Sequence, residues 1–223
     1  MEKPTDILNF GAQHTTTGRA YISAYNFPKN FISHDAFIGG KLKGKYCGGF
    51  GALIYADYAT SEIGPYKELI FIPGKFDVDG ECRYAATKIY VSTPAAINTA
   101  GDGYFGPKEV ATFKEEQLSD TLMHLSVHKG RNRVISVEIA TWSGIHFPLS
   151  TNVVSFPMLQ MLRGEERLLW QYEGECTATM ARIESVLVRP ALFPDVAAFS
   201  PLASFYFESF SLNFKPQPIE EKK

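Results

Sequence analysis

The sequence predicts a β-rich protein of mostly antiparallel strands with a few short helices. Apolar residues alternate with a period of two rather than 3.6 along most of the chain. The alternating runs are rich in aromatic and β-branched residues, and helix signals are few. Because the 223 residues contain no Pro/Gly/Ser-rich linker and no repeat, we expect one domain over residues 1–223. Only the ends, residues 1–6 and 216–223, are expected to be flexible.

The clearest strand pair lies in the middle of the chain. Residues 121–128 and 133–141 each place three apolar side chains on one face, and a turn at residues 128–132 separates them. This pattern predicts a β-hairpin. A second hairpin is expected where residues 168–172 pass through Glu173-Gly174-Glu175 into a long strand at 176–189. Further strands are expected at 21–25, 47–58, 66–72, 83–93 and 204–214.

One helix has recognisable start and stop signals. Thr93 offers a capping hydroxyl, Pro94 suits the first helical position, and Gly101 can end the helix after about two turns. A second segment, residues 157–162, fits either a helix or a loop that begins at its proline.

Charge and cysteine content exclude several classes of protein. Lys plus Arg (22) nearly balance Asp plus Glu (24), giving a net charge of −2 and no basic block for nucleic acid. The N-terminus has no apolar signal region, and no apolar stretch reaches the ~18 residues of a membrane span. We therefore expect a soluble, cytoplasmic protein. Cys47, Cys82 and Cys176 are odd in number and lack CxxC spacing, so we expect buried, reduced thiols and no zinc site.

The sequence contains none of the common catalytic motifs GxSxG, HExxH or the P-loop. Two other segments have features of a functional site. In residues 61–69 a Gly-Pro turn carries Glu62 and leads into an apolar strand. In residues 98–113 Lys108 follows Pro107 and an aromatic pair. Most lysines are surface charges, but desolvation of a sheltered lysine disfavours the ammonium and leaves an amine that can attack a carbonyl.

These segments resemble the acetoacetate decarboxylase family. SEIGPYKELIFIPG (residues 61–74) is similar to its acidic turn and following strand, and RYAATKIYVSTPAAINTAGDGYFGPKEVATF (residues 83–113) is similar to its Pro-Lys segment. The resemblance is strongest over residues 44–115, and TGRAY (residues 17–21) resembles the family's N-terminal arginine strand. It implies a closed, cone-like antiparallel β-barrel with a Schiff-base lysine inside. It also implies a homo-oligomer that needs no metal or organic cofactor.

The resemblance assigns three site residues. Lys108 matches the reactive lysine, Glu62 the acidic turn residue, and Arg19 the buried arginine that would hold a substrate carboxylate. Two features depart from the family. Glu109 replaces a second lysine, and no acid between residues 35 and 57 replaces a second carboxylate. If Glu109 faced Lys108 it would stabilise the ammonium, although adjacent strand residues point to opposite faces.

The leading functional hypothesis is a lyase that forms an iminium between Lys108 and a small oxo-acid. The resemblance favours decarboxylation of a β-keto acid such as acetoacetate, because an iminium accepts the electron pair released with carbon dioxide. An aldolase or dehydratase-type lyase on a small oxo-acid is the nearest alternative. A non-catalytic barrel that binds a small carbonyl ligand is the alternative from another class.

Overall fold

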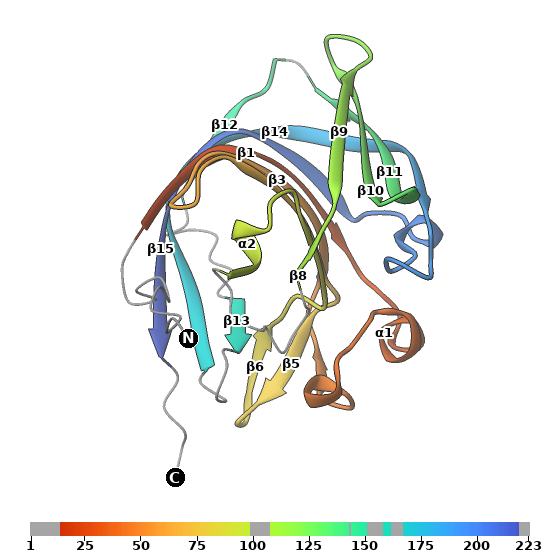
Figure 1. Cartoon of the computed structure of the whole chain (residues 1–223), viewed down its shortest axis with the longest axis vertical. Helices are drawn as coiled ribbons and strands as arrows, with labels where there is room; N and C mark the ends of the chain where they lie inside the picture. The colour runs from red at the N-terminus through yellow and green to blue at the C-terminus, as the bar shows by residue number, and fades with distance from the viewer. Residues whose placement is uncertain (1–13, 99–107, 143, 151–157, 162–166, 219–223) are drawn as a thin grey trace, which may run out of the picture.

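The computed structural model describes residues 14–98, 108–142, 144–150, 158–161 and 167–218. Of these described residues, 62% lie in strands and 9% in helices, and the strands form a nearly closed barrel (Figure 1). This arrangement confirms the predicted β-rich class and the barrel that the resemblance implies. Residues 1–6 and 219–223, expected to be loose, lie outside the described residues, whereas residues 216–218 continue the last strand.

The described strands belong to one sheet of 15 strands. In chain order the first eight are β1 (His14–Tyr25), β2 (Tyr46–Gly48), β3 (Gly51–Thr60), β4 (Tyr66–Ile72), β5 (Lys75–Val78), β6 (Glu81–Tyr84), β7 (Lys88–Val91) and β8 (Lys108–Val110). The others are β9 (Thr112–Gln117), β10 (Leu122–Lys129), β11 (Asn132–Thr141), β12 (Phe147–Ser150), β13 (Met158–Met161), β14 (Arg167–Val188) and β15 (Ala203–Pro218). The helices are α1 (Lys29–Asp35), α2 (Ala95–Asn98), and the 3-10 turns η1 (Gly40–Leu42) and η3 (Val196–Ala198).

The path of the sheet runs β2-β5-β6-β13-β14-β15-β1-β3-β4-β7-β8. The three strands β9, β10 and β11 branch from this path because β11 pairs with β14. In Figure 1 the main strands curve around an interior into which α2 projects, and β10 and β11 lie outside it. The central strands therefore have two covered faces.

The side chains of these central strands divide between two apolar clusters. Leu53 and Tyr55 of β3 join a large cluster that contains Leu125 and Ile135 from the β10 and β11 side. Tyr58, on the opposite face of β3, joins a smaller cluster together with Ala20, Ala56 and Phe210 from β1, β3 and β15. Because adjacent strand residues point to opposite faces, neighbours in sequence belong to different environments.

The predicted hairpin in the middle of the chain is confirmed as β10 and β11, and residues 66–72 form β4 as expected. The second predicted hairpin is wrong, because β14 runs without a turn through Glu173-Gly174-Glu175. A Cβ on Gly174 would lie 1.9 Å from the carbonyl oxygen of Ser211 on β15. The glycine therefore permits a close approach of two long strands rather than a turn.

The helices differ from the sequence prediction. The expected two-turn helix after Thr93 is the single turn α2, and Gly101 lies outside the described residues. The Thr93 hydroxyl accepts a hydrogen bond from the Ala95 amide at 3.4 Å, as its capping role predicts. Residues 158–161, where a helix or a loop was expected, form β13, and α1 was not predicted.

The cysteine prediction needs a correction. Cys47 on β2 and Cys82 on β6 form a disulfide, and only Cys176 is a free, partly buried thiol. Strands β2 and β6 both pair with β5, and the two Cα atoms lie 6.1 Å apart, within the range that a disulfide spans. The sequence spacing could not show this pairing, since it depends on how three strands associate.

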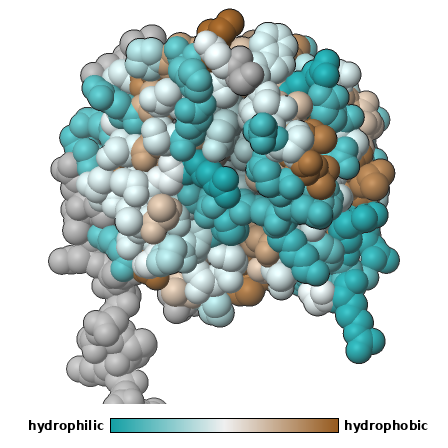
Figure 2. All heavy atoms as spheres, turned by 90° about the horizontal axis from the view of Figure 1, so that it is seen from above, coloured by the Kyte–Doolittle hydropathy of each residue, from teal (hydrophilic) through white to brown (hydrophobic). Residues whose placement is uncertain are grey.

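The surface seen from above is mostly hydrophilic, with apolar residues scattered among polar ones (Figure 2). In the part of the chain that the structure describes, the helices are all too short or too polar to cross a bilayer.

Candidate active site

Lys108 begins β8 and lies beside a buried carboxylate. Its Nζ is 3.0 Å from Oε1 of Glu68 on β4. The side chains are only 15% and 6% exposed, respectively. Strand β8 pairs with β7 in parallel, and Lys108 lies opposite Ile89. The lysine predicted from the sequence is therefore mostly buried, and its amine is paired with a carboxylate.

Glu68 is the acid that the sequence analysis missed. It occupies a strand whose following residues, from Leu69 to Ile72, are all buried and apolar. A carboxylate is rarely buried unless it is paired, and this one pairs with Lys108 and accepts a hydrogen bond from the Tyr58 hydroxyl at 3.4 Å. The available signal was an acidic residue directly before the buried, apolar part of a strand, six residues beyond Glu62.

Three tyrosines surround this carboxylate. The rings of Tyr58 and Tyr66 stack with centroids 4.6 Å apart, and Phe210 meets Tyr58 edge-on. Burial, with a further contribution from the charge of Glu68, raises the pKa of Tyr58, Tyr66 and Tyr172. The phenols therefore stay protonated at neutral pH and can act as neutral hydrogen-bond donors near the ion pair.

Glu62 occupies a different position from Glu68. It lies in the exposed turn that joins β3 to β4. The structure thus brings Lys108 together with Glu68, and it leaves the predicted acid at the rim of the strand pair.

Glu109 does not share an environment with Lys108. It forms ion pairs with Lys88 and Lys129, and it lies opposite Tyr90 on β7. Burial by itself would raise the pKa of Glu109, but hydrogen bonds from Lys129 and Lys88 lower it below the usual value. The residue at the position of the family's second lysine therefore faces away from the Lys108 amine, as strand alternation predicts.

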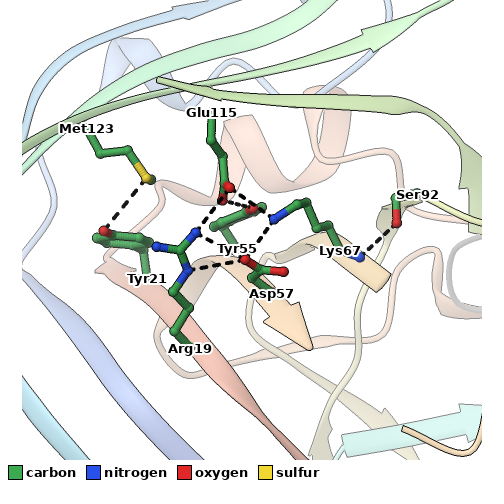
Figure 3. A network of polar contacts seen from close by, with 8 residues as sticks. All are labelled: Arg19, Tyr21, Tyr55, Asp57, Lys67, Ser92, Glu115 and Met123. Carbon is green, nitrogen blue, oxygen red and sulfur yellow. Dashed lines mark hydrogen bonds and ion pairs between the residues drawn. The ribbon is translucent and has the colours of Figure 1, made fainter. Parts of the chain in front are cut away.

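Arg19 also lies on the face opposite Lys108. Its guanidinium contacts Asp57 and Glu115, with Nη2 3.1 Å from a carboxylate oxygen of each (Figure 3). Lys67 bridges the same two acids, with Nζ 2.7 Å from Asp57 and 3.0 Å from Glu115. We call these four residues the charge quartet. The structure does not bring Arg19, the predicted carboxylate holder, to the Lys108 side of the sheet.

The charge quartet borders a cleft and also contacts aromatic residues. Tyr55 donates a hydrogen bond to Glu115, and Tyr21 lies beside the guanidinium (Figure 3). The cleft has a volume of about 350 Å³ and is lined by Asp57, Pro65, Tyr66, Lys67, Ser92, Ala111, Thr112 and Phe113. Within the described residues, groups of three or more His, Cys, Asp or Glu that could hold a metal ion are absent.

Comparison with known proteins shows similarity in structure. No protein-family model matches the chain, and no curated protein matches it. Acetoacetate decarboxylase from Legionella pneumophila superposes with a TM-score of 0.65 at 13% identity, covering 94% of this chain and 88% of that one. An acetoacetate decarboxylase-like enzyme from Sphingomonas wittichii RW1 gives 0.62 at 12% identity, covering 99% and 97%.

A third similar structure carries a ligand. The enduracididine biosynthesis enzyme MppR complexed with pyruvate gives a TM-score of 0.61 at 11% identity, covering 94% of this chain and 91% of that one. MppR also forms a complex with the condensation product of pyruvate and imidazole 4-carboxaldehyde. Together these similarities show that the chain has the acetoacetate decarboxylase-type fold.

Proposed function

We propose that this protein is a Schiff-base lyase in which Lys108 forms an iminium with a small oxo-acid and Glu68 transfers protons. The observation that carries the proposal is the 3.0 Å contact between the sheltered Lys108 amine and the buried Glu68 carboxylate. An amine must lose a proton before it attacks a carbonyl, and Glu68 is the acceptor within hydrogen-bond reach. Similarity to acetoacetate decarboxylase and related enzymes supports the reaction class.

The proposed reaction is decarboxylation of a β-keto acid. Glu68 accepts a proton from the Lys108 ammonium, and the neutral amine attacks the ketone carbon. The same proton then passes to the hydroxyl group, which leaves as water and gives an iminium. The carbon–carbon bond to the carboxylate then breaks, its electron pair enters the iminium to give an enamine, and carbon dioxide leaves. Glu68 then transfers a proton from solvent water to the enamine carbon, which is the one proton that the overall reaction consumes. Water then hydrolyses the new iminium, which releases the ketone and restores the amine.

An aldol-type condensation is the second candidate. It uses the same enamine, which attacks an aldehyde carbon instead of taking a proton. The MppR complex with a condensation product of pyruvate favours this alternative, because that protein has a similar fold. In this chain the same Lys108 would carry either reaction, so the choice depends on the second substrate.

Borohydride trapping tests the proposal. The protein is incubated separately with acetoacetate and with pyruvate, reduced with borohydride, and mapped by peptide mass spectrometry. We expect an adduct on Lys108 and none in the folded variant Lys108→Arg. An adduct on Lys67 or Lys88 in place of Lys108 would contradict the assignment. Binding of either ligand without any trapped adduct would favour the non-catalytic barrel, and release of carbon dioxide from acetoacetate would distinguish decarboxylation from condensation.

A further inference from the structure

The cleft beside the charge quartet has the size of a ligand site. Its volume is about 350 Å³, and small-molecule sites range from about 300 to 1,000 Å³. Neither Lys108 nor Glu68 is among the residues that line it. Lys67 lines the cleft and precedes Glu68 on β4, so strand alternation points these two side chains to opposite faces. The cleft is therefore a second place for a ligand, apart from the Lys108–Glu68 pair.

Asp57 presents a hydrogen-bond acceptor to this cleft. Nε and Nη2 of Arg19 lie 3.2 and 3.1 Å from its Oδ2, and Nζ of Lys67 lies 2.7 Å from the same oxygen. Among the polar contacts of the described residues Oδ1 has no partner, and Figure 3 shows dashed lines to one oxygen of Asp57 only. The side chain is 22% exposed and lines the cleft, so Oδ1 can accept a hydrogen bond from a cationic ligand group.

Lys67 and Ser92 present the matching donors. The Lys67 ammonium has three N–H donors, and its contacts with Asp57 and Glu115 use two of them. Oγ of Ser92 accepts a hydrogen bond from the Lys67 backbone amide at 2.8 Å, and the hydroxyl keeps its own hydrogen to donate (Figure 3). Because Lys67 Nζ contacts Oδ2 of Asp57, the remaining donor lies next to the carboxylate that carries the remaining acceptor.

We propose that this cleft binds a free α-amino acid with an apolar or aromatic side chain. The ammonium of such a ligand would meet Oδ1 of Asp57, and its carboxylate would meet Lys67 and Ser92. In an α-amino acid these two groups share one carbon atom, which matches the neighbouring acceptor and donors of the cleft. The ligand's side chain would lie against Pro65 and Phe113, which supply apolar surface to the same lining.

The charge balance of the quartet favours a ligand without net charge. Each of its two cations contacts both of its carboxylates, so two positive charges cancel two negative charges (Figure 3). A simple anion would be attracted by Lys67 and repelled by the adjacent Asp57, and a simple amine would meet the reverse arrangement. A zwitterion gains one attraction of each sign and leaves the total charge of the cluster at zero.

This inference does not depend on the proposed function. An amino acid of this class has no ketone or aldehyde carbon, so it offers Lys108 nothing with which to form an iminium. Its binding can therefore be measured separately from imine trapping.

Isothermal titration calorimetry on the full-length chain tests the proposal with L-phenylalanine and L-leucine. We expect one of these amino acids to bind with one site per chain. For L-phenylalanine, 3-phenylpropionate lacks the ammonium and 2-phenylethylamine lacks the carboxylate. Each of these analogues should bind at least about tenfold more weakly, because each loses a charged hydrogen bond. Lys108→Arg should bind the amino acid as the natural protein does.

Substitutions in the cleft locate the bound amino acid. Thr112→Trp should abolish binding, because Thr112 lines the cleft and an indole would fill its volume. Lys114→Trp is the matched control, since Lys114 is exposed on the same strand, β9, and does not line the cleft. Asp57→Asn should weaken binding at least about tenfold, because the ligand ammonium loses its counter-charge.

Three results would overturn the proposal. They are the absence of binding by both amino acids, equal affinity for L-phenylalanine and its two analogues, and loss of binding in Lys108→Arg but not in Thr112→Trp. Should Asp57→Asn fail to fold, Thr112→Trp and the two analogues still decide the outcome. A natural protein that binds the amino acid but forms no trapped imine would contradict the proposed function and support this inference.

Discussion

Replacing Glu68 with glutamine should make the Lys108 amine more reactive and at the same time slow turnover. The two charges are 3.0 Å apart in a mostly buried site. At an effective dielectric constant of about 20, the Coulomb attraction at that distance is roughly 5 kcal/mol, and part of it offsets the desolvation of the two ions. A remainder of only about 1.4 kcal/mol would still change the fraction of neutral amine tenfold.

Labelling with acetic anhydride measures the reactivity of the Lys108 amine, and release of carbon dioxide measures turnover. Labelling of Lys108 near neutral pH should be about tenfold faster in Glu68→Gln, because the ammonium loses its counter-charge. Release of carbon dioxide from acetoacetate should fall by about 10²-fold or more, because the amide cannot transfer the proton. Glu62→Gln, in the exposed turn before β4, is the comparison that tests the acid predicted from the sequence.

If labelling in Glu68→Gln is unchanged or slower, the carboxylate does not hold Lys108 as an ammonium. If Glu62→Gln loses turnover while Glu68→Gln keeps it, the acid assigned from the structure is wrong and the exposed turn supplies the catalytic carboxylate.

Three further predictions concern stability. Reduction of the Cys47–Cys82 disulfide, which links residues 35 positions apart, should cost about 4 kcal/mol by loop entropy and lower Tm by roughly 8 °C. Calorimetry with and without dithiothreitol checks this, and the double serine variant should show no response to the reductant. Phe71→Ala should destabilise the fold by about 4 kcal/mol in urea unfolding, because this fully buried ring packs against three other phenylalanines. A loss below ~1 kcal/mol would contradict its place in the core. The folded-state pKa of Glu109 is lowered, so its contribution to stability is present above the unfolded value and disappears as pH falls through the folded value. Urea unfolding of Glu109→Gln should therefore depend less on pH below about 5 than that of the natural protein, and equal slopes would contradict the ion pairs with Lys88 and Lys129.

The sequence by itself determined the strand-rich class, the hairpin of β10 and β11, and strand β4. These features depend on the alternation of apolar residues and on turn residues, and both signals lie within a few consecutive residues of the sequence. Lys108 could be singled out as a candidate from sequence, because its apolar approach and its resemblance to a known motif are both local. Its separation from Glu109 followed from the geometry of a single strand.

Only the tertiary structure decided which acid meets the lysine and where Arg19 lies. Alternation assigns two residues to opposite faces, but the pairing and curvature of the sheet decide which face encloses the site. Glu68 reaches Lys108 because β4 and β8 both flank β7, and Arg19 meets Glu115 because β9 lies over the other face of β1 and β3. The Cys47–Cys82 bond and the unbroken course of β14 have the same origin, since both depend on contacts between strands distant in sequence. The physical reason is that alternation along a strand assigns its side chains to two faces. What each face contacts depends on how the strands associate in the sheet.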